Sequence, residues 1–333
     1  MAWVRWREAT ERALYGDDGF FRRNAPAQHF RTSVHVSPAL AATLLRLARD
    51  SDLDTVVDVG AGGGELLSAL HRLAPGLRLV GVDLAGRPAA LPADVDWLDR
   101  IPGGLDGALL VGNEWLDDVP VDVVELTDDG WRLVLVDPAT GAERVGAAPA
   151  TEDAQWLADW WPAGTVGDRA EIGRPRDEAW AAAVGALTGG VAVAIDYAHH
   201  RSARPRMGSL TGYRHGRQVP PVPDGSCDVT SHVALDACAA AGTGAGATST
   251  LLTTQRAALT ALGVRRSTPP HELSRSDPAA YLRALATAGE VAELSDPDGL
   301  GGFGWLLQTR GVTRAPVDAA PWPTRAASAA DDR

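Results

Sequence analysis

The sequence predicts an α/β fold that is built on a mostly parallel β-sheet, and two observations support this prediction. Apolar or β-branched runs alternate along the chain with segments in which leucine recurs at helical spacing. Several runs are apolar throughout, which is typical of parallel strands that are covered by helices on both faces. The 333 residues are enough for one large domain with additions, or for two domains.

The first half of the chain supplies the clearest expected elements. A helix begins directly after a glycine-rich turn, so the first unit is predicted as strand, turn and helix. The next strand ends on Asp83, and a later apolar strand runs into Asn113 and Glu114. The expected strands cover 55–60, 77–83, 95–97 and 107–112, and the helix covers 65–73.

Between residues 121 and 147 the pattern changes to alternating strands with turn residues between them, which predicts a β-hairpin insertion. Residues 199–228 are rich in Arg, Pro and Gly and have no clear period, which favours a long functional loop or lid. The other expected elements are helices over 177–187, 232–241, 249–262 and 278–288 and strands over 190–197, 291–294 and 303–308.

These patterns also predict how the chain is organised. Residues 1–50 are expected to form an N-terminal cap segment, and 51–310 the main domain. A cap of helices and loops is expected over about 199–265 within that domain. The tail over 311–333 is rich in Ala, Pro and Asp, which predicts disorder.

Composition argues against several classes of function. The 43 acidic and 31 basic residues give a net charge of −12, which repels nucleic-acid phosphate and anionic lipid surfaces. The sequence contains no lysine, so no Schiff-base lysine or phosphate-binding lysine is present. We interpret the missing lysine as GC-rich, bacterial codon usage. Two cysteines, no apolar leader and no apolar run near the ~20 residues that span a bilayer predict a cytoplasmic protein away from membranes.

The strongest local signal is the glycine-rich turn, which contains Asp58, Gly60, Gly62 and Gly64. Glycine lets a backbone approach a ligand closely, and the following helix offers free N–H groups at its N-terminus. Asp83 closes the next strand, where a carboxylate can accept both hydroxyls of a ribose. Nucleoside binding is therefore the favoured interpretation, and a purely structural glycine turn is the alternative.

The spacing of the glycines discriminates between two nucleoside cofactors. The dinucleotide fingerprint would need a third glycine at position 65, which is Glu65 in this chain. An acid followed by three alternating glycines is instead typical of methyltransferases that use S-adenosylmethionine (AdoMet). AdoMet carries no phosphate, so the missing lysine is no obstacle to binding it.

Over about residues 15–310 the chain resembles the MidA family of AdoMet-dependent methyltransferases. The most specific matching blocks are Asn-Glu-x-Leu-Asp-x-x-Pro-Val at 113–121 and Asp-Val-Thr-x-His-Val at 228–233. Two departures stand beside them, since Gln28-His29 replaces Gly-Asp and the segment after Asp83 is short. Further matching blocks are Phe-Arg-Thr-Ser at 30–33, Arg-Ala-Glu-Ile at 169–172, Ile-Asp-Tyr at 195–197, Gly-Ser-Leu-x-x-Tyr at 208–213 and Thr-Gln at 254–255.

The resemblance implies a class I methyltransferase, with a Rossmann-like seven-stranded sheet and AdoMet as cofactor. Mitochondrial relatives in that family methylate an arginine of a respiratory complex I subunit, which implies a protein arginine as the acceptor. The alternatives are an O- or N-methyltransferase for a small molecule and a non-catalytic assembly factor that keeps the fold. A homodimer is a further possibility.

The cofactor side of the expected site combines the glycine turn and Asp83 with two further residues. Trp97 is expected near the adenine, and Asn113 is expected either to border the cofactor or to hold its own loop through backbone hydrogen bonds. Glu114 follows an apolar strand at the carboxyl edge of the sheet, where ligands of open α/β folds bind. We expect its carboxylate to orient the acceptor, and a strand-end cap is the alternative.

The acceptor side is expected to include residues from later strands. Asp196 and Tyr197 end a strand at the same edge, and Tyr197 either contacts the acceptor or only packs there. Asp228 and His232 would share one face of a helix and could remove a proton, or Asp228 would cap that helix. The resemblance adds Thr32 and Ser33 to the substrate-binding residues, and no metal site is expected.

Overall fold

The computed structural model describes residues 3–23, 38–162, 164–312 and 317–322. Its main element is a seven-stranded sheet in the order β16–β17–β10–β5–β2–β3–β4, in which β17 alone runs antiparallel to its neighbours. This confirms the predicted Rossmann-like fold class. The strands are β2 (Thr55–Val59), β3 (Arg78–Val82), β4 (Asp96–Leu98), β5 (Leu105–Asn113), β10 (Leu187–Asp196), β16 (Ser249–Thr254) and β17 (Gly304–Arg310).

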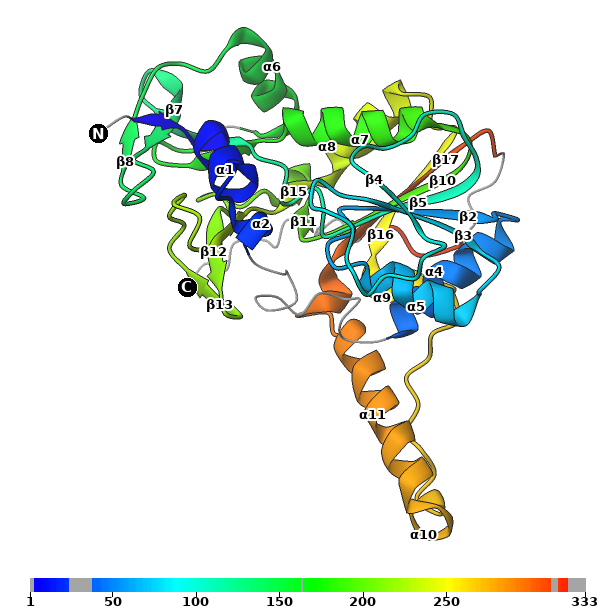
Figure 1. Ribbon diagram of the computed structural model, residues 1–333. Coiled ribbons are helices and arrows are strands. Elements are labelled where there is room, and N and C mark those ends of the chain that lie inside the picture. The colour runs from blue at the N-terminus through cyan, green and yellow to red at the C-terminus, as the bar shows by residue number, and fades with distance from the viewer. Residues whose placement is uncertain (1–2, 24–37, 163, 313–316, 323–333) are drawn as a thin grey trace.

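Helices cover both faces of this sheet (Figure 1). Successive side chains of a strand point to opposite faces, so Val56 and Leu109 pack in one buried cluster while Val57 and Leu110 pack in the other. Burying each such side chain contributes roughly 1.5–3 kcal/mol. The helices are α4 (Pro38–Asp50), α5 (Glu65–Leu73) and α9 (Gln255–Ala261) on one face and α7 (Arg174–Ala186) and α8 (Leu235–Gly244) on the other.

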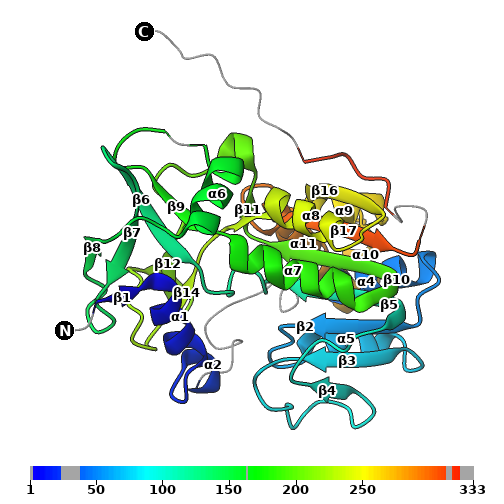
Figure 2. The same ribbon diagram turned by 90° about the horizontal axis from the view of Figure 1, so that it is seen from above.

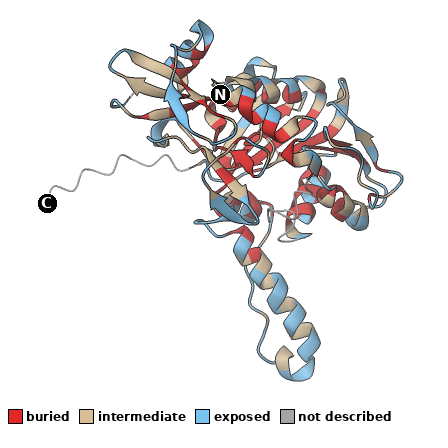
Figure 3. Cartoon of the chain, turned by 60° about the vertical axis from the view of Figure 1, so that its left-hand side comes forward, coloured by how far each residue is buried: buried red, intermediate tan, exposed pale blue. Residues whose placement is uncertain are grey.

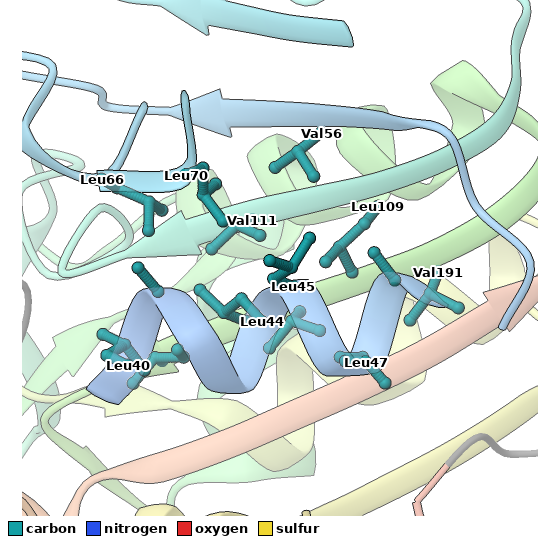
Figure 4. Packing of buried hydrophobic residues seen from close by; sticks show 14 of the residues in the cluster. Leu40, Leu44, Leu45, Leu47, Val56, Leu66, Leu70, Leu109, Val111 and Val191 are labelled. Atoms are coloured by element: carbon teal, nitrogen blue, oxygen red, sulfur yellow. The ribbon is translucent and has the colours of Figure 1, made fainter. Parts of the chain in front are cut away.

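The packing of α4 shows why its sequence forms a covering helix. Leu40, Leu44 and Leu47 recur at spacings of three and four, so they share one helical face and are fully buried. Figure 4 shows these side chains in one buried cluster with Leu109 and Val191 of the sheet. The core therefore lies between α4 and the central strands.

A second sheet lies beside the first (Figure 2), in the order β1–β7–β6–β9 with β8 paired to β7. The expected hairpin insertion over 121–147 supplies its two middle strands, β6 and β7, and also β8. The N-terminus and a later segment complete it, and those long-range pairings leave no local pattern in the sequence. The elements of this unit are β1 (Val4–Arg5), β6 (Asp122–Thr127), β7 (Gly130–Val136), β8 (Glu143–Val145), β9 (Arg169–Ile172), α1 (Trp6–Tyr15), α2 (Phe20–Arg23) and α6 (Thr151–Trp160).

The segment expected to be a loop or lid over 199–228 forms small sheets. One has the order β13–β12–β14, and a short pair joins β11 to β15. Asp228 lies in a strand, so the prediction that it begins a helix with His232 on the same face is wrong: the backbone of 228–230 pairs with that of 211–213. The strands are β11 (Ala198–His199), β12 (Thr211–Arg214), β13 (Arg217–Val219), β14 (Asp228–Thr230) and β15 (Val233–Ala234), with a 3₁₀ turn at Arg201–Ala203.

Two later expectations about secondary structure are wrong. The helix expected over 249–262 begins only at Gln255, because the threonine-rich run before it pairs as β16 with β17. The strand expected over 291–294 is the end of α11 (Pro278–Leu294), whose Val291 and Leu294 are buried at its base. With α10 (Leu273–Ser276), α11 forms a projecting arm that is mostly exposed (Figure 3).

Much of the expected cap over 199–265 belongs to the main sheet, because α8 and α9 cover its faces and β16 forms its edge. The expected disordered tail also contains an ordered part. Val317 is buried, and the amide of Trp322 donates to the carbonyl oxygen of Leu252 at 2.9 Å. The prediction of disorder therefore does not hold for 317–322. Among the described helices, none combines the length and apolar character needed to cross a bilayer.

A close contact at Gly81 of β3 gives a test of this packing. A Cβ atom there would lie 2.4 Å from the ring of Trp97 and 2.9 Å from Leu67 Cδ1. We expect Gly81→Ala to lower the free energy of unfolding by about 1–3 kcal/mol, because the indole must move. Gly76→Ala is the control, since a Cβ at Gly76 meets no atom within 4 Å. Equal thermal unfolding of the two variants would contradict the packing described.

Candidate functional site

A cavity of about 1290 Å³ lies at the carboxyl ends of β2, β3, β5 and β10. This is the edge at which open α/β sheets bind ligands. Residues of α1, β12 and β14 close it from the side of the second sheet. Eight of the predicted site residues line the cavity: Asp58, Gly60, Gly62, Asp83, Asn113, Glu114, Tyr197 and Asp228.

The glycine turn owes its shape to residues that adopt left-handed backbone angles. Gly60, Gly62 and Gly64 have φ values of 71°, 52° and 73°, a region that side-chain-bearing residues rarely occupy. At Gly60 a Cβ would also meet Trp115 at 3.0 Å. Gly64 sits at the start of α5 behind the cavity wall, so it shapes the turn without lining the cavity.

Asp83 joins this turn to the end of the neighbouring strand. Its Oδ2 accepts a hydrogen bond from the amide of Gly62 at 2.8 Å, and Oδ1 accepts one from the amide of Ala85 at 2.7 Å. Burial raises the pKa of Asp83, and the two amide hydrogen bonds oppose that rise. The carboxylate is thus held at the cavity wall in one orientation. Asp58 lies beside it, and its pKa is raised by burial and by the charges of Asp83 and Glu65.

Trp97 does not line the cavity, in contrast to the prediction that it lies near an adenine. Its indole packs under Gly81, and its Nε1–H donates to the carbonyl oxygen of Ala85 at 3.0 Å. Trp97 therefore supports the turn that follows Asp83. The residues after β4 that do reach the cavity are Asp99, Arg100 and Ile101, only two to four positions further along.

Asn113 and Glu114 lie at the end of β5. Glu114 has a φ of 52°, and its amide donates to the carbonyl oxygen of Ile195 at 2.8 Å. A left-handed conformation in a residue with a long side chain is disfavoured, and such residues gather at functional sites. The side chains of the pair are also linked, since Asn113 Nδ2 donates to Glu114 Oε1 at 3.2 Å.

A group of carboxylates, here called the acidic wall, lines the cavity beyond Glu114. Asp117 and Asp118 follow β5, and Asp228 comes from β14. Asp117 Oδ2 accepts a hydrogen bond from the hydroxyl of Thr230 at 3.0 Å, and the carboxyl of Asp117 also pairs with that of Asp196. Oδ1 of Asp228 is buried with no hydrogen-bond partner among the described residues. Burial and the charge of Asp117 raise the pKa of Asp228 to about 8. Burial also raises the pKa of Asp118.

Sequence reasoning missed Arg176, which holds this wall together. The residue is 2% exposed, and its guanidinium donates to the carbonyl oxygens of Asp117 at 2.6 Å, Val119 at 3.1 Å and Ser231 and His232 at 3.0 Å each. The helix expected from the sequence begins only at residue 177, so Arg176 precedes it there, and no local pattern gives a sign of these contacts. Tyr15 was also missed; its hydroxyl donates to the carbonyl oxygen of Asp118 at 3.0 Å.

Asp196 has a structural position and does not line the cavity, in contrast to its predicted substrate-binding role. It is 0% exposed, and its Oδ2 accepts hydrogen bonds from the amides of Leu116 at 3.0 Å and Asp117 at 3.3 Å. The carboxylate thus fixes the segment that carries the acidic wall. Burial and the charge of Asp117 raise its pKa.

Tyr197 and His232 lie next to each other, but only Tyr197 lines the main cavity. The two rings are stacked with centroids 5.7 Å apart, and Phe303 packs 4.1 Å from Tyr197 on centroids. His232 lines a second cavity of about 500 Å³, which Tyr197 borders as well. This placement does not support proton removal by His232. Thr32 and Ser33 lie outside the described residues.

The alternating glycines, the anchored Asp83 and a cavity at the switch edge of the sheet fit AdoMet, whose sugar and amino-acid parts need close backbone and a carboxylate. No cluster of metal-ligating side chains occurs in the described parts of the chain. Fold and site together define a class I AdoMet-dependent methyltransferase.

Comparisons with known proteins agree with this class. The family model described as "Putative S-adenosyl-L-methionine-dependent methyltransferase" matches residues 74–253, and the chain belongs to that family. A "likely methyl transferase" from Burkholderia thailandensis, crystallised with S-adenosyl-homocysteine, is 29% identical with a TM-score of 0.76, over 96% of this chain and 89% of that one. An uncharacterized protein of the same superfamily and organism is 26% identical, with the same TM-score and coverage. No curated protein matches the chain. The cofactor is AdoMet.

Asp83 provides the most direct test of the cofactor side. We expect Asp83→Asn to weaken binding of S-adenosylhomocysteine by about tenfold or more, because a charged acceptor of hydrogen bonds is lost. Calorimetric titration measures this, and Asp94→Asn is the control, since Asp94 is exposed and bonded to His71. An unchanged dissociation constant in Asp83→Asn would contradict the assignment.

Proposed function

We propose that this enzyme methylates a cationic nitrogen, that a protein arginine is its acceptor, and that it is a member of the MidA family. The observation that carries the proposal is the acidic wall of the cavity, formed by Asp117, Asp118 and Asp228, where a buried oxygen of Asp228 has no hydrogen-bond partner in the described parts of the chain. The acidic surface of the protein, with a net charge of −12, favours approach of a basic segment.

The energetics of the wall favour a cationic occupant. A buried carboxylate without a partner is costly, and a cation that enters the cavity relieves that cost. Arg176 neutralises the wall only in part, because its hydrogen bonds go to backbone carbonyl oxygens and the hydroxyl of Ser231. A guanidinium offers planar N–H groups that match carboxylate oxygens in pairs.

The aromatic residues around the cavity fit the same acceptor. Tyr15, Tyr197 and Tyr213 line it from three different elements. Aromatic rings attract the face of a guanidinium and limit how it can turn. Burial raises the pKa of Tyr197, so this ring stays neutral during the reaction.

In the proposed mechanism the protein contributes alignment and charge. Bound AdoMet supplies an electrophilic methyl group. Asp83 and the glycine turn fix the nucleoside, while Glu114 and the acidic wall hold the acceptor nitrogen in line with that methyl.

Incubation with methyl-labelled AdoMet and a bacterial lysate tests the acceptor class. We expect label in protein and, after acid hydrolysis, in methylarginine. Label confined to small molecules would overturn the protein acceptor, and label in protein residues other than arginine would overturn the guanidinium.

The same assay tests Glu114. We expect Glu114→Gln to reduce incorporation by about tenfold or more, because a charged contact with the acceptor is lost, while AdoMet binds as before. Glu11→Gln, at an exposed position of α1, is the matched control. Full incorporation with Glu114→Gln would refute its role in holding the acceptor.

A further inference from the structure

We propose that Asp228 pairs with the acceptor guanidinium and takes the proton that leaves its nitrogen during methyl transfer. The inference rests on the proposed function and deepens it, because it assigns the proton acceptor to one carboxylate of the acidic wall. It replaces the expectation that His232 removes this proton.

The strand geometry of β14 directs Asp228 toward the cavity. Side chains alternate along a strand, and Asp228 and Thr230 both line the cavity, whereas Val229 between them packs in a buried apolar cluster with Trp6 and Ala9. Tyr213 lies directly opposite Asp228 on β12 and lines the cavity too. Paired residues of neighbouring strands share a face, so the two side chains border the same space.

Asp228 is the member of the wall that is best placed to accept a proton. It is 4% exposed, and its Oδ1 has no hydrogen-bond partner among the described residues. Asp117, by contrast, accepts a hydrogen bond from Thr230 at its Oδ2. It also lies beside Arg176, whose positive charge lowers the pKa of Asp117 and so opposes the effect of burial. A buried oxygen without a partner is a destabilising feature that a folded protein retains where a ligand supplies the partner.

The groups that face Asp228 give its titration a direction. They are Asp117 and Asp118 from the segment after β5, Tyr15 from α1, Tyr213 from β12, and Cys227, which precedes Asp228 in the chain. Burial and the negative charge of Asp117 raise the pKa of Asp228 to about 8. The carboxyl of Asp228 is therefore mostly protonated at neutral pH as long as no cation lies beside it. A cation that enters the cavity stabilises the carboxylate, lowers this pKa and releases the proton to solvent.

Methyl transfer from AdoMet to the acceptor nitrogen conserves atoms, charge and electrons when Asp228 takes the proton. The bond between the methyl carbon and the sulfonium sulfur breaks, its electron pair stays on sulfur, and neutral S-adenosylhomocysteine results. The acceptor nitrogen forms the new bond to carbon and gives up one N–H proton to the ionised Asp228. The product is a methylguanidinium beside a protonated Asp228, whose proton passes to water when the product leaves.

A pair of cofactor analogues tests this without knowledge of the natural acceptor. One is an adenosine that carries a guanidinium on a short alkyl chain at the 5′ position, and the other carries a neutral urea of the same shape. Calorimetry at pH 7 in two buffers of different ionisation enthalpy gives both the affinity and the number of protons released. For the wild-type protein we expect tighter binding of the guanidinium analogue, with release of about one proton.

Asp228→Asn is the decisive variant. We expect it to bind the guanidinium analogue about ten- to a hundred-fold more weakly and without proton release, while the urea analogue and S-adenosylhomocysteine bind as before. Asp137→Asn is the matched control, because Asp137 is equally buried but bonds the amide of Ala139 in a turn away from the cavity. Asp228→Glu is the second variant, and we expect it to restore the proton release.

The outcomes separate this inference from the proposed function. Equal binding of both analogues by the wild-type protein would overturn the cationic acceptor itself. A preference for the guanidinium that Asp228→Asn retains, together with its proton release, would overturn only the role of Asp228. If Asp228→Asn fails to fold, Asp228→Glu decides, since absence of proton release in that variant contradicts the inference.

Discussion

The buried guanidinium of Arg176 is the contact on which the acceptor half of the molecule depends. From α7, beneath the main sheet's carboxyl edge, it binds carbonyl oxygens of the segment after β5 and of the segment between β14 and β15. These two segments carry the carboxylates of the acidic wall. One side chain therefore sets the distance between Asp117 and the strand of Asp228, and its positive charge makes their joint burial tolerable.

The two ends of the cavity are built in different ways. The cofactor end is made mainly of backbone, because alternating glycines shape the turn and Asp83 accepts hydrogen bonds from two backbone amides. The acceptor end is made of side chains from distant parts of the chain, and Asp228 keeps a buried oxygen that no described residue pairs with. This difference between the two ends suits an enzyme that recognises its constant cofactor by shape and its acceptor by charge.

The sequence predicts the central strands of the main sheet and the glycine turn, because both are encoded in local patterns. It makes the edge strand β16 part of a helix and places Trp97 at the cofactor, because strand pairing and the packing under Gly81 leave no such pattern. The strand, glycine turn and helix around Gly60–Gly64 follow from residues within about one turn of each other. The acceptor end is different: Tyr15, Arg176 and Tyr213 come from three separate elements, and no spacing relates them. Asp228 and His232 were misplaced for the same reason, since the pairing of β14 with β12 overrides a spacing of four that suits a helix.

A crystal structure with S-adenosylhomocysteine tests the central claim, which is that the acidic wall faces the methyl donor. We expect the ribose hydroxyls to bind the carboxylate of Asp83 and the sulfur to point toward Glu114 and Asp228. A sulfur that points away from both carboxylates, with the ribose out of reach of Asp83, would contradict it.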